Sequence, residues 1–164
     1  MLTQGKLSKG AVVATNNTKS HLMKILIICT GNTCRSQMAE GFLRSFDPVL
    51  EVFSAGTKAE QKVNPYAVKA MSEIGIDISK QHPKQVDIFL NEKFDYVITV
   101  CDGAKEICPI FTGSVQHRMH MGFEDPAEAK GNEKEIMEVY QKVRDQIKEQ
   151  FYTFYLSENR MNTP

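Results

Sequence analysis

The sequence has few cysteines, no net charge and no long hydrophobic run. Its 164 residues include four cysteines, and none of them forms a Cys-x-x-Cys pair, which argues against a disulfide scaffold, a zinc site of that type and a thioredoxin-like motif. Twenty basic and twenty acidic residues cancel, so charge gives no reason to expect a nucleic acid or a membrane surface as partner. No apolar stretch approaches the length of a membrane-spanning helix. We therefore expect a soluble, cytoplasmic, single-domain protein.

Residues 1–22 differ from the rest of the chain because they contain neither an acidic residue nor an arginine. Their apolar piece, residues 10–14, is too short for a signal-peptide core, and a transit peptide would carry arginine. We expect residues 1–22 to be a disordered extension, residues 23–156 to form the folded domain, and residues 157–164 to be a C-terminal tail.

The most informative segment is the loop sequence CTGNTCRS, from Cys29 to Ser36. It follows an apolar, β-branched run from Lys24 to Ile28, which predicts a buried strand. It precedes Gln37 to Phe46, whose apolar residues recur at helical spacing. Loop N–H groups and the N-terminus of a helix favour negative charge. The pattern therefore predicts an anion site in the loop where the strand ends and the helix begins.

Cys29 is the candidate nucleophile of this loop. The positive field and Arg35 predict a lowered pKa for its thiol, and Ser36 can donate a hydrogen bond to it. Arg35 offers a planar fork for two oxygens of a tetrahedral oxyanion. The competing interpretation is an inert buried thiol. The residues expected to surround the oxyanion are Thr30, Gly31, Asn32, Thr33, Cys34 and Arg35, with the Cys34 thiol itself packed inward.

Later segments alternate between strand and helix patterns. Strands are expected at Leu50–Ser54, Asp95–Val100 and Val115–Met119, and helices at Asn64–Ile74, at Gln85–Leu90 and from Asn132 onward, where Glu135 completes a capping box. The alternation predicts one α/β domain with a four-stranded parallel sheet and helices on both faces. Ligands bind at the carboxyl ends of such strands. Cys29, Cys101 and Asp125 should therefore meet at one edge.

Cys101 and Cys108 lie seven residues apart on a small, polar segment. Two thiols facing a thiol nucleophile suggest thiol–disulfide exchange, and the alternative is a pair of idle thiols. Asp125 is a candidate acid that could protonate a leaving oxygen, although Glu124 stands beside it and a plain helix cap is the other interpretation. The four histidines show no ligand spacing, so we expect no metal site.

At this point the residues match a known family. The chain resembles the thioredoxin-coupled arsenate reductases, which share their fold with the low-molecular-weight protein tyrosine phosphatases. The motifs that carry the resemblance are CTGNTCRSQMAEG from Cys29, VFSAG from Val52, VNP from Val63, GIDIS from Gly75, VITVC ending at Cys101, the pair Cys108-Pro109, GFEDPA from Gly122 and VRDQIK from Val143.

The resemblance implies reduction of arsenate to arsenite with thioredoxin as the reductant. Cys29 would attack arsenate held by the loop and Arg35, and Asp125 would protonate the departing hydroxyl. Cys101 would then attack the Cys29 sulfur and release arsenite. Cys108 would attack Cys101 in turn, which leaves a Cys101–Cys108 disulfide for thioredoxin to reduce.

Some members of that family bind potassium beside the loop. Residues that match Asn32, Glu40 and Ser54 hold the ion together with an acid, and this chain has Lys84 where the acid would stand. Because a lysine ammonium could replace the ion, we expect activity that is largely independent of potassium, and no tightly bound cofactor.

Two other functions remain open on the sequence. A protein tyrosine phosphatase could use the same loop without redox steps, but such enzymes usually have aromatic residues after the Asp-Pro pair, and Ala127-Glu128-Ala129 follow here. A redox-sensing or partner-binding module could use the cysteines alone. It would not need Arg35 to hold an oxyanion, so the enzyme interpretation is favoured.

Overall fold

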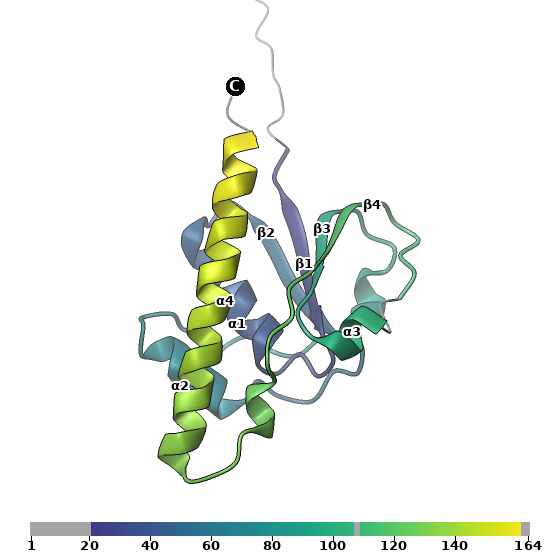
Figure 1. The fold of residues 1–164 in the computed structure, drawn as a ribbon. Helices are drawn as coiled ribbons and strands as arrows, with labels where there is room; N and C mark the ends of the chain where they lie inside the picture. The colour runs from purple at the N-terminus through teal and green to yellow at the C-terminus, as the bar shows by residue number, and fades with distance from the viewer. Residues whose placement is uncertain (1–20, 107–108, 162–164) are drawn as a thin grey trace, which may run out of the picture.

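The computed structural model describes residues 21–106 and 109–161 (Figure 1). Four strands form a single sheet of order β2-β1-β3-β4, and each neighbouring pair is parallel. The strands are β1 (Lys24–Cys29), β2 (Glu51–Gly56), β3 (Phe94–Thr99) and β4 (Val115–His120). The predicted four-stranded parallel sheet is confirmed.

Helices cover both faces of this sheet. They are α1 (Arg35–Phe46), α2 (Pro65–Ser72), α3 (Asp102–Glu106) and α4 (Glu133–Met161), with short 3-10 turns η1 (Val86–Phe89) and η2 (Pro126–Glu128). Figure 1 shows α1, α2 and α4 together on one side of the strands. Ser54 of β2 donates a hydrogen bond to Glu40 of α1, whereas Phe53 contacts Phe89 of η1 with ring centroids 5.5 Å apart. Since adjacent strand residues point to opposite faces, η1 covers the face opposite α1.

The core follows the hydrophobic pattern of the sequence. Ile25, Leu26, Ile27 and Ile28 of β1 are all fully buried, as expected for a central strand of a parallel sheet. The apolar stripe of α4 is buried from Met137 to Phe154. This long helix packs along α1, where the ring centroids of Phe46 and Tyr155 lie 6.0 Å apart, and its buried side chains join the core.

Helix ends form where the local signals predict them. At the start of α2, Asn64 accepts a hydrogen bond from the Tyr66 N–H at 2.9 Å. After the end of α2, Gly75 adopts a positive φ of +80°, a conformation that prevents the helix from continuing. At the start of α4, Glu135 accepts from the Asn132 N–H at 2.8 Å while Asn132 accepts from the Glu135 N–H at 3.0 Å. The capping box is therefore confirmed in both directions.

Three segments differ from the sequence-based expectations. The segment expected as a helix at Gln85–Leu90 forms the short 3-10 turn η1, and α3 was not expected at all. Helix α4 continues to Met161, so residues 157–161 of the expected tail are helical. Cys108 and residues 1–20 lie outside the described residues. In the part of the chain that the structure describes, no helix combines the length and apolar character needed to cross a bilayer.

Candidate active site

The carboxyl edge of the sheet brings the candidate residues together. Cys29 is the last residue of β1, and Cys101 follows β3. The Thr30 hydroxyl lies 3.4 Å from the Cys101 sulfur, which joins the loop after β1 to the start of α3. Arg35 lies 3.4 Å from Asp125 in the loop after β4. The loops that follow β1, β3 and β4, which are far apart in sequence, therefore lie together at this edge.

The loop from Cys29 to Ser36 wraps around the Cys29 sulfur. The Asn32 backbone N–H donates to this sulfur at 3.1 Å, and the Ser36 hydroxyl lies 2.9 Å from it. Asn32 adopts a φ of +55°, which costs energy for a residue with a side chain. Its side-chain amide donates to Ser36 at 2.7 Å and to Ser54 at 3.0 Å, and these contacts hold the strained turn in place.

The loop carbonyls point away from the sulfur, toward residues 57–64. Because this segment donates backbone N–H groups to them, the loop N–H groups are left facing inward. Within the described residues, the N–H groups of Gly31, Thr33 and Cys34 have no protein acceptor, as expected of an anion cradle. The donor–acceptor pairs are Thr57 to Cys29 (3.1 Å), Lys58 to Thr30 (2.9 Å), Glu60 to Gly31 (3.0 Å) and Asn64 to Thr33 (3.0 Å).

The sequence-based expectation for the Cys29 pKa is wrong. Burial raises the pKa of this thiol above its ordinary value, and the hydrogen bonds from Ser36 and the Asn32 N–H only partly oppose the effect. Cys29 is 3% exposed, so its charged form loses most of its hydration. The Arg35 guanidinium, which was expected to lower this pKa, instead contacts the Phe123 carbonyl and the Asp125 carboxylate.

We expect this burial to appear in the chemistry of the reduced protein without added anion. The alkylation rate of Cys29 by iodoacetamide should keep rising by about tenfold per pH unit to beyond pH 9, because only the thiolate reacts. Mass spectrometry of the Cys29 peptide measures this rate. In urea-unfolded protein the same peptide should level off near its ordinary pKa of about 8.5. A plateau below pH 7 in the folded protein would contradict the expectation.

Arg35 and Asp125 form a pair beside the cradle. Arg35 donates to the Phe123 carbonyl at 3.0 Å and lies 3.4 Å from the Asp125 carboxylate. Asp125 also accepts the Ala127 N–H at 3.0 Å, so it caps η2 as well. The neighbouring Glu124 instead pairs with Lys142 of α4 at 3.2 Å. The sequence left both acids open, and the geometry favours Asp125.

The remaining described thiols occupy different surroundings. Cys34 is buried with its sulfur 3.6 Å from the Tyr140 hydroxyl, and burial raises its pKa to about 11. This thiol packs inward, as expected, and only its backbone faces the cradle. Cys101 is buried next to Thr30. Cys108 lies outside the described residues, so its distance from Cys101 has no structural account.

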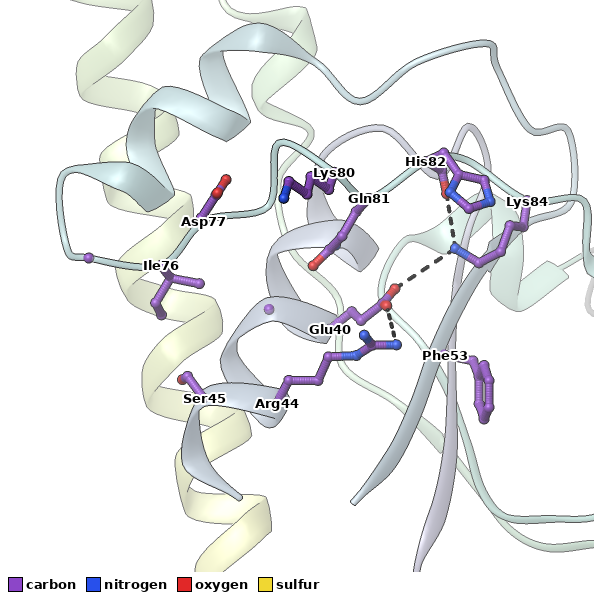
Figure 2. A pocket seen from close by; sticks show the side chains of 12 residues that line it. Glu40, Arg44, Ser45, Phe53, Ile76, Asp77, Lys80, Gln81, His82 and Lys84 are labelled. Atoms are coloured by element: carbon purple, nitrogen blue, oxygen red, sulfur yellow. Dashed lines mark hydrogen bonds and ion pairs between the residues drawn. The ribbon is translucent and has the colours of Figure 1, made fainter. Parts of the chain in front are cut away.

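Glu40, which the family resemblance aligns with a potassium ligand, already has two cationic side chains beside it (Figure 2). Glu40 accepts from Ser54 at 2.5 Å, and Arg44 lies 2.8 Å from its other oxygen. The Lys84 ammonium lies 4.0 Å from Glu40 and donates to the His82 carbonyl at 2.9 Å. Burial lowers the pKa of Lys84, and Glu40 opposes that shift. This donor set does not fit a further monovalent cation.

No cluster of three or more His, Cys, Asp or Glu residues within the described ranges suits a metal ion. The sequence-based reasoning missed the segment from Thr57 to Glu60, which holds the loop through backbone atoms, and Gln37, whose amide contacts the loop from α1. Almost any residue type can make a backbone hydrogen bond, so the sequence does not reveal these contacts. Gln37 did carry a signal, since it is a polar residue placed just inside a buried helix.

Comparison with known proteins places these observations in a family. The family of low molecular weight phosphotyrosine protein phosphatases matches residues 24–161. A protein of Halalkalibacterium halodurans named arsenate reductase is 48% identical over 131 residues, 79% of this chain and 93% of that protein. A solved arsenate reductase in the phosphate binding state has 29% identity and a TM-score of 0.67, and the match covers 83% of this chain and 98% of the other. A Corynebacterium glutamicum thioredoxin-dependent arsenate reductase has 29% identity and a TM-score of 0.57, over 84% of this chain and 64% of that one. The present chain belongs to the low molecular weight phosphotyrosine protein phosphatase family.

Proposed function

We propose that this chain is a cytoplasmic arsenate reductase that converts arsenate to arsenite and is regenerated by thioredoxin. The observation that carries the proposal is the position of two buried thiols. Cys29 lies in a loop whose Gly31, Thr33 and Cys34 N–H groups find no acceptor among the described residues. Cys101 lies against Thr30 of the same loop. A phosphatase needs only the first thiol, whereas a thiol relay needs both.

In the first step, arsenate enters the cradle and the Cys29 sulfur attacks arsenic. A sulfur–arsenic bond forms and an arsenic–oxygen bond breaks. The thiol proton passes through the bound oxyanion to the Asp125 carboxylate, and Asp125 then gives it to the leaving hydroxyl, which departs as water. Arg35 turns from the Phe123 carbonyl and binds two arsenate oxygens.

In the second step, the Cys101 thiolate attacks the Cys29 sulfur. A Cys29–Cys101 disulfide forms while the sulfur–arsenic bond breaks, and its electron pair stays on arsenic, which becomes arsenite. Cys108 then attacks Cys101 and frees Cys29, and two electrons from a thioredoxin dithiol reduce the Cys101–Cys108 disulfide. The thioredoxin-dependent relative from Corynebacterium glutamicum supports this choice of reductant.

A phosphatase is the second candidate, because the matching family is described by that activity and phosphate is close to arsenate in shape. A loop built for one tetrahedral oxyanion discriminates poorly against the other. We expect slow hydrolysis of p-nitrophenyl phosphate, which requires Cys29 but no second thiol. This substrate therefore provides an independent measure of the cradle.

Disulfide mapping by mass spectrometry tests the proposal. The fully reduced protein is mixed with arsenate in the absence of any external reductant, and phosphate serves as the control anion. A Cys101–Cys108 bond formed only with arsenate, together with one equivalent of arsenite, is the expected result. Four thiols that stay reduced with both anions, alongside turnover of p-nitrophenyl phosphate, would point to the phosphatase instead.

We expect arsenate reduction to be largely independent of potassium, because Lys84 already places a positive charge beside Glu40. At equal ionic strength, kcat/KM in potassium chloride and in sodium chloride should agree within about twofold. Lys84→Asp supplies the matched variant, since it restores the acid found in potassium-binding relatives and should introduce a potassium response. Strong stimulation of the unmodified protein by potassium over sodium would refute the prediction.

A further inference from the structure

We infer that Gln37 and Gln81 are positioning residues that fix the orientation of the Asn32–Thr33 peptide in the oxyanion cradle. The inference rests on the proposed function to the extent that the cradle holds an oxyanion substrate, and it applies equally to arsenate and to a phosphate ester. Neither glutamine contacts the reacting atoms. Both act through the backbone of Asn32.

Within the described residues, one carbonyl of the loop has no backbone N–H partner. Of the five consecutive carbonyls from Cys29 to Thr33, four accept N–H groups from residues 57–64. The Asn32 carbonyl is the exception, and it accepts from the Gln37 side-chain amide at 3.0 Å. A side chain therefore completes what backbone atoms do at the other four positions.

The orientation of the Gln37 amide is set in turn by Gln81. Gln37 is fully buried, and its amide oxygen accepts from the Gln81 amide at 2.7 Å. Gln81 also donates to the Gln37 backbone carbonyl at 3.1 Å. Because the oxygen of Gln37 faces a donor, its nitrogen must face the Asn32 carbonyl. Gln81 comes from the segment that crosses α1 beside Glu40 and Lys84 (Figure 2).

The held carbonyl determines where the next N–H group points. In a trans peptide, the C=O and the following N–H point in opposite directions. With the Asn32 carbonyl held against α1, the Thr33 N–H is turned away from α1, and it has no acceptor within the described residues. It is therefore available to an oxyanion. Rotation of this one peptide would replace a donor in the cradle with an acceptor.

Backbone strain makes the restraint necessary. Within the described residues, Asn32 is the one position with positive φ that is not glycine, so the loop stores energy at this peptide. The Asn32 side chain is held by Ser36, Ser54 and the Lys84 N–H, but none of these bonds reaches the carbonyl of the peptide that follows it. Gln37 supplies the missing restraint.

Gln37→Glu tests this role because it changes the hydrogen-bonding character at nearly constant shape. Because burial raises the pKa of a carboxyl group at this position, the comparison is made at pH 9, where a carboxylate would face the Asn32 carbonyl and two acceptors would repel. We expect kcat/KM for p-nitrophenyl phosphate to fall about a hundredfold, the cost of losing one oxyanion-binding donor. At pH 5 the protonated acid can donate to the same carbonyl, and the deficit relative to the unmodified protein at that pH should shrink to about fivefold.

The matched controls separate positioning from general damage. Gln146→Glu makes the same chemical change on the exposed face of α4 and should leave kcat/KM unchanged at both pH values. Gln81→Leu removes the group that orients Gln37 and should lower kcat/KM about tenfold at both pH values. It has no carboxylate, so it should not recover at pH 5.

Two results would overturn the inference. One is a Gln37→Glu protein with normal kcat/KM at pH 9, and the other is a deficit at pH 9 that persists in full at pH 5. If Gln37→Glu does not fold, Gln81→Leu decides, and normal activity of that variant overturns the inference. Failure of the unmodified protein to reduce arsenate would refute the proposed function alone, because p-nitrophenyl phosphate still reports on the cradle.

Discussion

Replacing Cys29 with serine is expected to abolish both arsenate reduction and p-nitrophenyl phosphate hydrolysis, each by at least about 10⁴-fold. A serine hydroxyl is a far weaker nucleophile than a thiolate near neutral pH. Serine also cannot form the disulfide that transfers electrons to arsenic, so the reductase loses two functions at one atom. Steady-state assays of both substrates with equal amounts of folded protein measure the loss.

The control for this variant is binding rather than turnover. The substitution leaves the N–H groups of Gly31, Thr33 and Cys34 in place, so Cys29→Ser should still bind inorganic phosphate within about threefold of the unmodified affinity. Titration calorimetry gives that affinity. Turnover above about one-hundredth of normal, with phosphate binding intact, would show that another residue is the nucleophile.

The central unit of strand, loop and helix was predictable because its signals are local. The apolar run from Ile25 to Ile28 marks a buried strand, and the amphipathic pattern after Ser36 marks a helix. Gly31 and Asn32 permit the tight loop between them, and Asn32 does adopt positive φ. The capping residues of α2 and α4 act within one helical turn, and the sequence identified them for the same reason.

Features that depend on distant parts of the chain were not predictable in the same way. The pKa of Cys29 is raised rather than lowered because burial around the thiol is a property of the whole fold. The choice between Asp125 and Glu124 required the positions of Arg35 and Lys142, which lie on α1 and α4. None of these relations can be read from spacing along the chain.

The backbone hydrogen bonds that hold the loop carbonyls are a further feature that the sequence did not reveal. Residues 57–64 hold four loop carbonyls through their own N–H groups, and almost any residue type could do so. At Gly56, just before this segment, the close packing requires glycine, because a Cβ there would lie 2.5 Å from the Thr30 carbonyl oxygen. A glycine at the end of a strand has many explanations, so the sequence alone did not reveal the contact.

Replacing Cys101 with serine is expected to separate the two activities of the cradle. Hydrolysis of p-nitrophenyl phosphate should stay within about threefold of normal, because the substituted side chain keeps a hydroxyl beside Thr30 and the cradle is unchanged. Steady-state arsenate reduction with thioredoxin should fall at least about 10³-fold. Cys101→Ser removes the thiol that lies beside the loop and would attack the Cys29–arsenic adduct at sulfur, so we expect arsenic to remain oxidised.

A single-turnover experiment completes this test. Reduced Cys101→Ser protein mixed with arsenate should release no arsenite, whereas the unmodified protein should release one equivalent per chain. Addition of a small thiol should restore slow release, because an external thiolate can attack the Cys29 sulfur in place of Cys101. Normal arsenite release by Cys101→Ser without added thiol would mean that another thiol resolves the adduct. The position of Cys101 against Thr30 would then have no part in electron transfer.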